Sequence, residues 1–119
     1  MSSDCTKYNC PVVTTLDMIG GKYKALILWH LVDGTRRFGE LRRLVPQATQ
    51  KMLTQQLREL EEDNLIIRTV YPVVPPKVEY QLSDLGMSIK PILDAMRLWG
   101  AGYLRSRGVE ADCFMMGEG

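Results

Sequence analysis

The side chains most able to do chemistry form one polar surface in the middle of the chain. Four hydrogen-bonding residues recur there at helical spacing: Lys51, Thr54, Gln55 and Arg58. No acidic residue interrupts this stretch before Glu59. Ammonium, guanidinium, amide and hydroxyl groups on one helical face can bind phosphate oxygens and the edges of bases. The pattern therefore indicates nucleic-acid binding rather than catalysis.

The opposite side of the same stretch predicts the helix that positions these groups. Leu53, Leu57 and Leu60 follow i, i+4, i+7 spacing, which is typical of a buried helical face. Thr49 is a suitable N-cap, and Asn64 can adopt the left-handed conformation that ends a helix. We therefore expect an amphipathic helix between these two residues.

A hairpin is predicted directly after this helix. Residues 66–71 and 77–82 are rich in β-branched and aromatic residues, and the second segment alternates apolar with polar positions. The prolines between the two segments cannot donate to a β-ladder, so they mark the tip. A helix followed by a hairpin with a basic tip, here at Lys77, is the layout of a winged helix-turn-helix.

Three helices are predicted before this region. Pro11 can open the first, and a glycine pair ends it. The second runs from about Lys22 to Val32 and is apolar nearly all round, so it belongs in the core. A short extended segment at residues 35–37 precedes a third helix, which closes before Pro46. The fold class expected is α+β, mainly α.

One long helix is predicted at the C-terminal end, capped by Ser83 and kinked by Pro91. Its apolar stripe, Leu85 to Tyr103, is longer than a small core needs to cover, so it predicts a dimer surface. The residues expected at that interface, including two from the first helix, are Val12, Leu16, Ile89, Leu93, Met96, Trp99 and Tyr103. We expect tails at residues 1–9 and 106–119 around a DNA-binding domain at residues 10–105.

The distribution of charge supports nucleic acid, although the net charge is only +1. Between residues 34 and 58 Glu40 is the only acid. The basic residues of that window are Arg36, Arg37, Arg42, Arg43, Lys51 and Arg58. Local charge matters most for phosphate contact, because salt screens fields beyond about 8–10 Å. No window is apolar enough to span a membrane and the N-terminus carries no secretory signal pattern, so we expect a cytoplasmic protein without a membrane partner.

The cysteines and the histidine do not form a metal or catalytic constellation. Cys5, Cys10 and Cys113 are odd in number and His30 is the only histidine, so we expect no disulfide framework, metal, cofactor or catalytic residue. His30 fits a core position. Cys10 fits two interpretations, a small buried apolar residue or a thiol that senses oxidants or electrophiles, because a helix start stabilises thiolate.

The side chains expected to contact DNA come from the third helix, the turn, the fourth helix and the wing. They are Arg42, Arg43, Gln47, Thr49, Gln50, Lys51, Thr54, Gln55, Arg58 and Lys77. Gln can pair with adenine and Arg with guanine, whereas Arg42, Arg43 and Lys51 are expected to hold phosphates.

Five motifs together resemble the HxlR family of bacterial transcriptional regulators, within the MarR-like winged-helix group. They are C-P-V at Cys10, T-L-D-M-I-G-G-K-Y-K-A-L-I-L-W-H-L from Thr15, F-G-E-L-R-R-L-V-P from Phe38, Q-K-M-L-T-Q-Q-L-R-E-L-E-E-D-N-L-I-I-R-T-V-Y-P from Gln50, and P-P-K-V-E-Y-Q-L-S-D-L-G from Pro75. The resemblance covers about residues 10–104, and Tyr23 stands where the family often has Trp.

The resemblance implies a homodimer joined by its N- and C-terminal helices, a recognition helix in the major groove and a wing at the minor groove. In several members a cysteine at the place of Cys10 senses oxidants, quinones or aldehydes. We therefore expect a homodimeric, sequence-specific regulator on double-stranded DNA with a pseudo-palindromic operator, responsive through Cys10 to a small electrophile or oxidant. Two alternatives remain open. One is control by a small molecule in an apolar pocket near Trp99 or Tyr103, and the other is a protein-interaction module without DNA binding.

Overall fold

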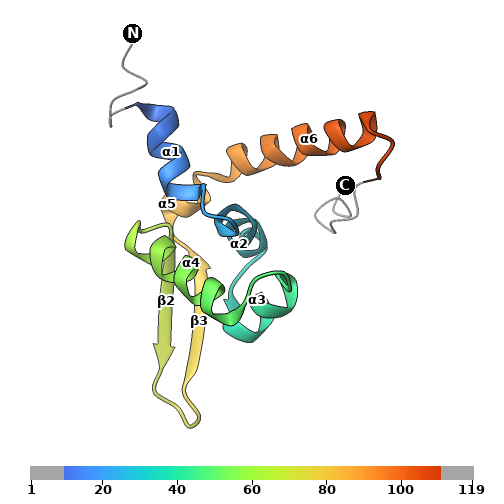
Figure 1. Ribbon diagram of the computed structural model, residues 1–119. Helices are drawn as coiled ribbons and strands as arrows, with labels where there is room; N and C mark the ends of the chain where they lie inside the picture. The colour runs from blue at the N-terminus through green and yellow to red at the C-terminus, as the bar shows by residue number, and fades with distance from the viewer. Residues whose placement is uncertain (1–9, 111–119) are drawn as a thin grey trace. The chain divides into compact units, whose positions relative to one another are not determined.

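A computed structural model of the protein describes residues 10–110, and it separates the chain into two compact units, one through Met87 and one from Ser88 (Figure 1). The elements of the first unit are α1 (Pro11–Ile19), α2 (Lys24–Val32), β1 (Arg36–Arg37), α3 (Phe38–Leu44), α4 (Gln50–Glu62), β2 (Ile66–Tyr71), β3 (Lys77–Leu82) and α5 (Asp84–Met87). The second unit contains α6 (Lys90–Ser106). The mainly helical winged helix-turn-helix expected from the sequence is confirmed.

The core of the first unit is built on α2. Ile27, Leu28 and Leu31 are almost fully buried, as expected for a helix that is apolar nearly all round. His30 on the same helix is also buried, which confirms its expected core position. The helix begins at Lys24 rather than near Lys22, because the preceding residues form a turn.

The helix-turn-helix consists of α3 and α4. Leu41 in the middle of α3 and Val45 just after its end are buried, and the chain turns before α4 begins. Thr49 caps α4 as predicted, since its Oγ1 accepts a hydrogen bond from the backbone N–H of Met52 at 3.1 Å. Asn64, just past the end of this helix, has a φ of 63°, the left-handed conformation that the sequence suggested.

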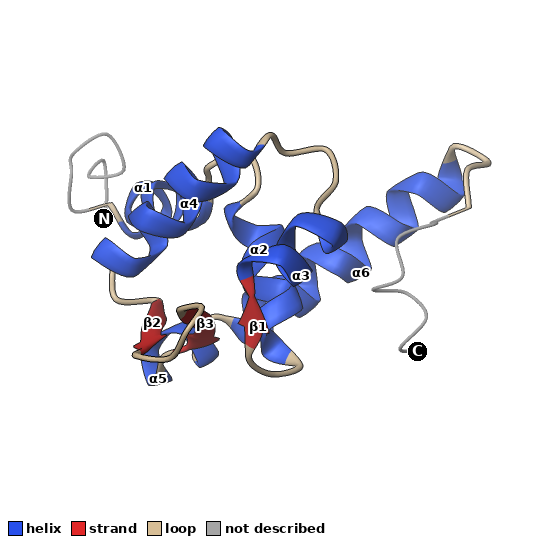
Figure 2. Cartoon of the chain, turned by 90° about the horizontal axis from the view of Figure 1, so that it is seen from below, coloured by secondary structure: helices blue, strands red, loops and turns tan. Residues whose placement is uncertain are grey.

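The wing is an antiparallel sheet with strand order β1-β3-β2 (Figure 2). Both long strands begin and end at the predicted residues. Arg68 lies opposite Tyr80, and Tyr71 lies opposite Lys77. Side chains directly opposite each other in an antiparallel pair share a face, so Arg68 and Tyr80 project from one side and Tyr71 and Lys77 from the other.

The predicted single helix after Ser83 is wrong in one respect, because the structure has two helices there, α5 and α6. Ser83 does cap α5, since its Oγ accepts a hydrogen bond from Gly86 N–H at 2.9 Å. Pro91 does not kink a continuous helix but lies in the first turn of α6. A proline has no N–H to donate, and its ring clashes with the carbonyl four residues earlier, which here belongs to Met87 at the end of α5.

Candidate nucleic-acid interface

The exposed face of α4 presents the polar side chains that the sequence brings together. Five of them line one shallow hollow along the helix: Gln50, Lys51, Thr54, Gln55 and Arg58. All five are exposed, whereas Leu53, Leu57 and Leu60 on the opposite face are buried. The capping hydrogen bond of Thr49 occupies its hydroxyl as an acceptor, so this residue defines where the helix starts. The helix therefore offers a row of donors and amides to solvent.

The two arginines of α3 extend this surface. Arg42 and Arg43 are exposed, and Arg42 Nη1 donates a hydrogen bond to Gln50 Oε1 at 3.3 Å, which joins the two helices of the motif. The carboxylate of Glu40, the only acid of this basic window, accepts a hydrogen bond from the backbone N–H of Arg37 at 2.7 Å. Its negative charge therefore lies at the start of α3, where the helix dipole favours it.

Residues 21–24, at the start of α2, hold α4 in place through hydrogen bonds and an ion pair. The sequence patterns did not predict this role. Tyr23 N–H donates a hydrogen bond to Gln56 Oε1 at 3.1 Å, and its hydroxyl donates to the carbonyl of Gln47 at 3.2 Å. A Cβ on Gly21 would stand 2.6 Å from Gln56 Oε1, so the second glycine of the pair permits this close approach. The glycine pair was predicted only as a helix break, and no short-range pattern shows its contact with a residue so distant in the sequence.

An ion pair completes this attachment. Lys24 Nζ lies 2.8 Å from Glu59 Oε1, and Gln55 Nε2 donates a hydrogen bond to Glu59 Oε2 at 2.7 Å. The Gln55 hydrogen bond and the neighbouring Lys24 ammonium lower the pKa of Glu59 below its ordinary value. The first acid of α4 therefore holds the helix in place and also fixes the amide of Gln55, one of the predicted DNA-contacting side chains.

Lys77 at the wing tip has partners on the wing itself. Its Nζ lies 4.9 Å from the centre of the Tyr71 ring and 3.4 Å from Glu79 Oε2, and the residue is half-buried. The cation is therefore partly neutralised on the outer face of the hairpin. Val74 at the tip is almost fully exposed, so the end of the wing is apolar.

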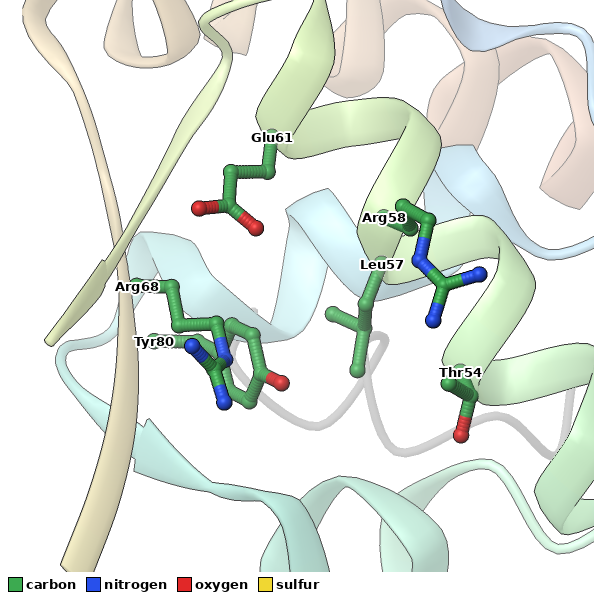
Figure 3. A pocket seen from close by; sticks show the side chains of 6 residues that line it. All are labelled: Thr54, Leu57, Arg58, Glu61, Arg68 and Tyr80. Carbon is green, nitrogen blue, oxygen red and sulfur yellow. The ribbon is translucent and has the colours of Figure 1, made fainter. Parts of the chain in front are cut away.

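A second hollow, of about 340 Å³, lies between α4 and the strands (Figure 3). The six residues that line it are Thr54, Leu57, Arg58, Glu61, Arg68 and Tyr80. Sequence reasoning identified Thr54 and Arg58 but missed Arg68 and Tyr80. The alternation of β2 was a usable signal, because it places Arg68 two residues from buried Ile66 and hence on the same face of the sheet.

The predicted dimer residues differ in exposure. Trp99 is 73% exposed, Met96 and Tyr103 are also exposed, and the Trp99 and Tyr103 rings stack with centroids 5.7 Å apart. Val12 and Leu16 are exposed on α1, and Ile89 is partly exposed. Leu93 is only 3% exposed, so it cannot contribute much additional apolar area to an interface.

Cys10 is the N-cap residue of α1 and is 1% exposed. Its carbonyl accepts the first hydrogen bond of the helix, from Thr14 N–H at 2.9 Å. Both interpretations of this residue depend on these features, since burial suits a packing role and the helix start suits a reactive thiol. Cys5 and Cys113 lie outside the described residues.

The fold and the exposed face of α4 define a winged helix-turn-helix protein. A model of the HxlR-like helix-turn-helix family matches residues 18–107. The chain belongs to this family, and it is a transcriptional regulator with a MarR-like fold. Within residues 10–110 no helix is long and apolar enough to cross a membrane.

Individual relatives agree with this assignment. The HTH-type transcriptional regulator YtcD of Bacillus subtilis is 58% identical over 98 residues, which are 82% of this chain and 78% of YtcD. The redox regulator HypR in its oxidized form has a TM-score of 0.74 and 54% identity, over 76% of this chain and 94% of HypR. The reduced transcriptional regulator YodB from B. subtilis has a TM-score of 0.67 and 34% identity, over 76% of this chain and 89% of YodB.

Proposed function

We propose that the protein regulates transcription as a homodimer that binds double-stranded DNA at a pseudo-palindromic operator. The observation that carries this proposal is the exposed face of α4, which displays Lys51, Thr54 and Arg58 beside two exposed glutamines. A helix of this kind enters the major groove with its N-terminal part against base edges. Gln50 and Gln55 have the donor and acceptor pair that matches adenine.

The remaining basic residues divide between phosphate contact and internal pairing. Arg42, Arg43 and Lys51 are the proposed phosphate contacts, because they are exposed at the start of α4 and on α3. Gln47 and Thr49 lie in the turn before α4, near enough in sequence to approach the same stretch of backbone. Lys77 already interacts with Glu79 and with the Tyr71 ring, so it is less available to DNA. We therefore propose that the wing contributes less to DNA-binding affinity than α4 does.

A homodimer is proposed because α1 and α6 both expose large apolar side chains. Val12, Leu16, Met96, Trp99 and Tyr103 are the residues concerned. Single exposed apolar residues are ordinary on a protein surface, but a stripe along one helix is typical of an interaction surface. A two-fold dimer would select half-sites separated by about one helical turn of DNA, about 10 bp, or a multiple of it.

The DNA-binding proposal is tested by measuring affinity for random-sequence duplex at several salt concentrations. We expect affinity to fall steeply as salt rises, because phosphate contacts release counterions. Arg43→Gln should lower the slope of log affinity against log salt by about one. Arg105→Gln, which removes the same charge from an exposed site on α6, is the matched control and should leave the slope unchanged. A salt-independent wild type would favour the alternative of a protein-interaction module.

Selection of binding sites from random DNA then tests the operator. Pseudo-palindromic sites are expected from a two-fold dimer, and a set of purely asymmetric sites would contradict it.

We also propose that Cys10 makes this regulator responsive to oxidants or electrophiles. The similarity to HypR, which is named a redox regulator, supports the proposal, as does the position of the thiol at a helix start. Relatives of this chain are transcriptional regulators, and we propose no catalytic activity for it.

A further inference from the structure

The side-chain amide of Gln55 is held by a neighbour that can only accept hydrogen bonds. Gln55 is exposed, and its Nε2 donates to Glu59 Oε2 at 2.7 Å, about one turn further along α4. An ionised carboxylate has no hydrogen to donate, so only the nitrogen end of the amide can face it. The carbonyl oxygen Oε1 is therefore the end of the amide that is left for another molecule.

Glu59 is itself fixed from its other side. Its Oε1 lies 2.8 Å from Nζ of Lys24, an ammonium group on α2 that is nearly buried. The hydrogen bond from Gln55, and then the contact with Lys24, lower the pKa of Glu59, so its carboxylate stays ionised at neutral pH. A carboxylate bound through both oxygens has little freedom to turn. Hydrogen-bond donation to Glu59 therefore comes from Lys24 on one side and from Gln55 on the other.

The other exposed glutamine at the DNA-facing surface of α4 is arranged in the opposite way. Gln50 Oε1 accepts a hydrogen bond from Arg42 Nη1 at 3.3 Å, and a guanidinium group has only donors. Gln50 therefore leaves its Nε2 to a partner. This contact is longer than that of Gln55, and both of its residues are exposed. Gln55 is thus the glutamine whose orientation is held more firmly.

The two ends of an amide fit different bases. In the major groove adenine and cytosine present an amine, which donates, whereas guanine and thymine present a carbonyl oxygen, which accepts. An amide that is free to turn fits both kinds of base. A glutamine that turns its oxygen to the DNA fits the amine bases alone. Adenine also offers N7 to the remaining hydrogen of Nε2, so adenine should rank above cytosine.

We infer that Glu59, held by Lys24, determines which bases Gln55 binds, and that the operator has adenine or cytosine, not guanine or thymine, at the position that Gln55 contacts. This inference rests on the proposed function, because it needs α4 in the major groove. It goes further by giving one operator position a chemical class. Glu59 contacts no base in this arrangement, so it is a positioning residue that acts through Gln55.

A purely structural role for Glu59 is the competing explanation, since its ion pair also joins α4 to α2. Loss of a structural role would weaken binding to all operator variants alike. Loss of the positioning role would change the preference at a single base pair. Substitutions that differ in hydrogen bonding at this one residue separate the two explanations.

The experiment begins with selection of binding sites from random duplex by the full-length protein. Affinities are then measured for a panel in which each base pair of the selected operator is changed in turn. Gln55→Ala identifies its own base pair, as the one at which the preference is lost. At that position the wild type should favour adenine or cytosine over guanine or thymine by about fivefold or more.

Glu59→Gln is the decisive variant, because it keeps the size of the side chain. The ammonium of Lys24 would bind the oxygen of the new amide and leave its nitrogen to face Gln55. Gln55 would then accept with Oε1 and turn Nε2 to the DNA, so the preference should reverse toward guanine or thymine. Glu59→Met cannot hydrogen-bond in this way and should abolish the preference without reversing it. Glu62→Gln removes the same charge from an exposed site on α4 and should keep the wild-type preference.

The hydrogen bond can also be measured without DNA. We expect the side-chain amide NMR signals of Gln55 to shift in Glu59→Gln and to stay in place in Glu62→Gln. Thermal unfolding of each variant shows whether the fold is kept. In a Gln55→Ala background, Glu59→Gln should no longer change the preference at the identified base pair.

Four results decide the matter. Unchanged Gln55 signals in Glu59→Gln would overturn the inference, because the carboxylate would not hold the amide. Equal weakening of all operator variants by Glu59→Gln, with the base preference intact, would leave Glu59 a structural role only. If duplex is bound but Gln55→Ala changes no base preference, the proposed function stands and the inference fails. If the Gln55 signals shift as expected but the wild type binds no duplex, the DNA-binding proposal fails and the base assignment fails with it.

Discussion

Lys24 on α2 and Glu59 on α4 form an ion pair of 2.8 Å in which the two partners differ in exposure. The lysine side chain is 7% exposed and that of the glutamate is 36% exposed. Loss of the glutamate leaves a nearly buried ammonium without its carboxylate, whereas loss of the lysine leaves a carboxylate that water can reach. The cost of breaking the pair therefore depends on which partner is removed.

We expect Glu59→Met to destabilise the protein more than Lys24→Met, as measured by urea unfolding. Both substitutions keep the aliphatic part of the side chain. Lys90→Met is the control, because its ion pair with Asp94 is about as short, at 2.9 Å, but both partners are well exposed. That substitution should cost about 0–1 kcal/mol. An equal cost for the first two variants would contradict the asymmetry that their burial implies.

The only histidine of the chain gives the stability a predictable pH dependence. Burial is the main cause of a lowered pKa for His30, with a further lowering by Arg36 and an opposing effect of Asp33. The unfolded chain therefore takes up the proton near pH 6.5, whereas the folded protein binds it only at lower pH. The free energy of unfolding should fall as pH decreases below about 6.5, until the folded pKa is passed.

An NMR titration of the single histidine checks the direction, and urea unfolding between pH 7 and pH 5 checks the consequence. His30→Gln should remove this part of the pH dependence. A folded His30 pKa at or above 6.5 would show that burial does not control this side chain.

The local elements could be predicted from the sequence because their signals are short in range. Both long strands were placed correctly, since a proline-rich tip and Asn64 mark their ends. The burial of Leu53, Leu57 and Leu60 followed from spacing alone. The break between α5 and α6 was missed because a single proline is compatible with a kink as well as with a new helix.

The contacts between distant segments could not be predicted in this way. The partners of Gln56 and Glu59 lie more than thirty residues earlier, at Tyr23 and Lys24. The alternation of β2 puts Arg68 on the same face as Ile66, but its position beside α4 depends on how the hairpin packs against that helix. Sequence patterns thus predicted the helical face and left its supporting residues unknown.

Trp99 is the residue whose substitution should most affect assembly, because it is the most exposed aromatic side chain of α6 and stacks on Tyr103. We expect Trp99→Lys combined with Met96→Asp to give a monomer that binds the operator weakly, since each half-site is then bound alone. Light scattering at micromolar concentration measures the mass. Arg105→Ala, on the same helix, should remain dimeric. A monomeric wild type under these conditions would refute the proposed dimer.

Lys51 and Arg58 should play different roles on the exposed face of α4. Lys51→Ala is expected to weaken all sequences alike and to lower the salt slope by about one, as loss of a phosphate contact does. Arg58→Ala should relax the preference for one base, with about 1–3 kcal/mol lost at that position. Binding to a panel of single-base operator variants at two salt concentrations distinguishes the effects. The reverse pattern would mean that the two roles are exchanged.

Cys10 is 1% exposed, so an oxidant can reach its thiol only when the start of α1 opens. We expect diamide or benzoquinone to change operator affinity slowly, and to act faster in urea concentrations too low to unfold the protein. Cys10→Ser and Cys10→Ala should both abolish the response and keep operator binding under reducing conditions. The alanine variant is needed because a buried hydroxyl costs about 1–3 kcal/mol and the serine variant is less stable for that reason.

Cys5→Ser and Cys113→Ser are the controls for the Cys10 prediction, and both positions lie outside the described residues. They should leave the response largely intact, and mass spectrometry should find the modification on Cys10. If the thiol of Cys10 is modified while operator affinity stays constant, the residue has only a packing role. Modification of Cys10 should change operator affinity because the covalent adduct is too large for the closely packed site of the thiol. The start of α1 would then stay displaced after the reaction. Because α1 also carries Val12 and Leu16 of the proposed dimer surface, its displacement would change the spacing of the two recognition helices and hence the fit to both half-sites.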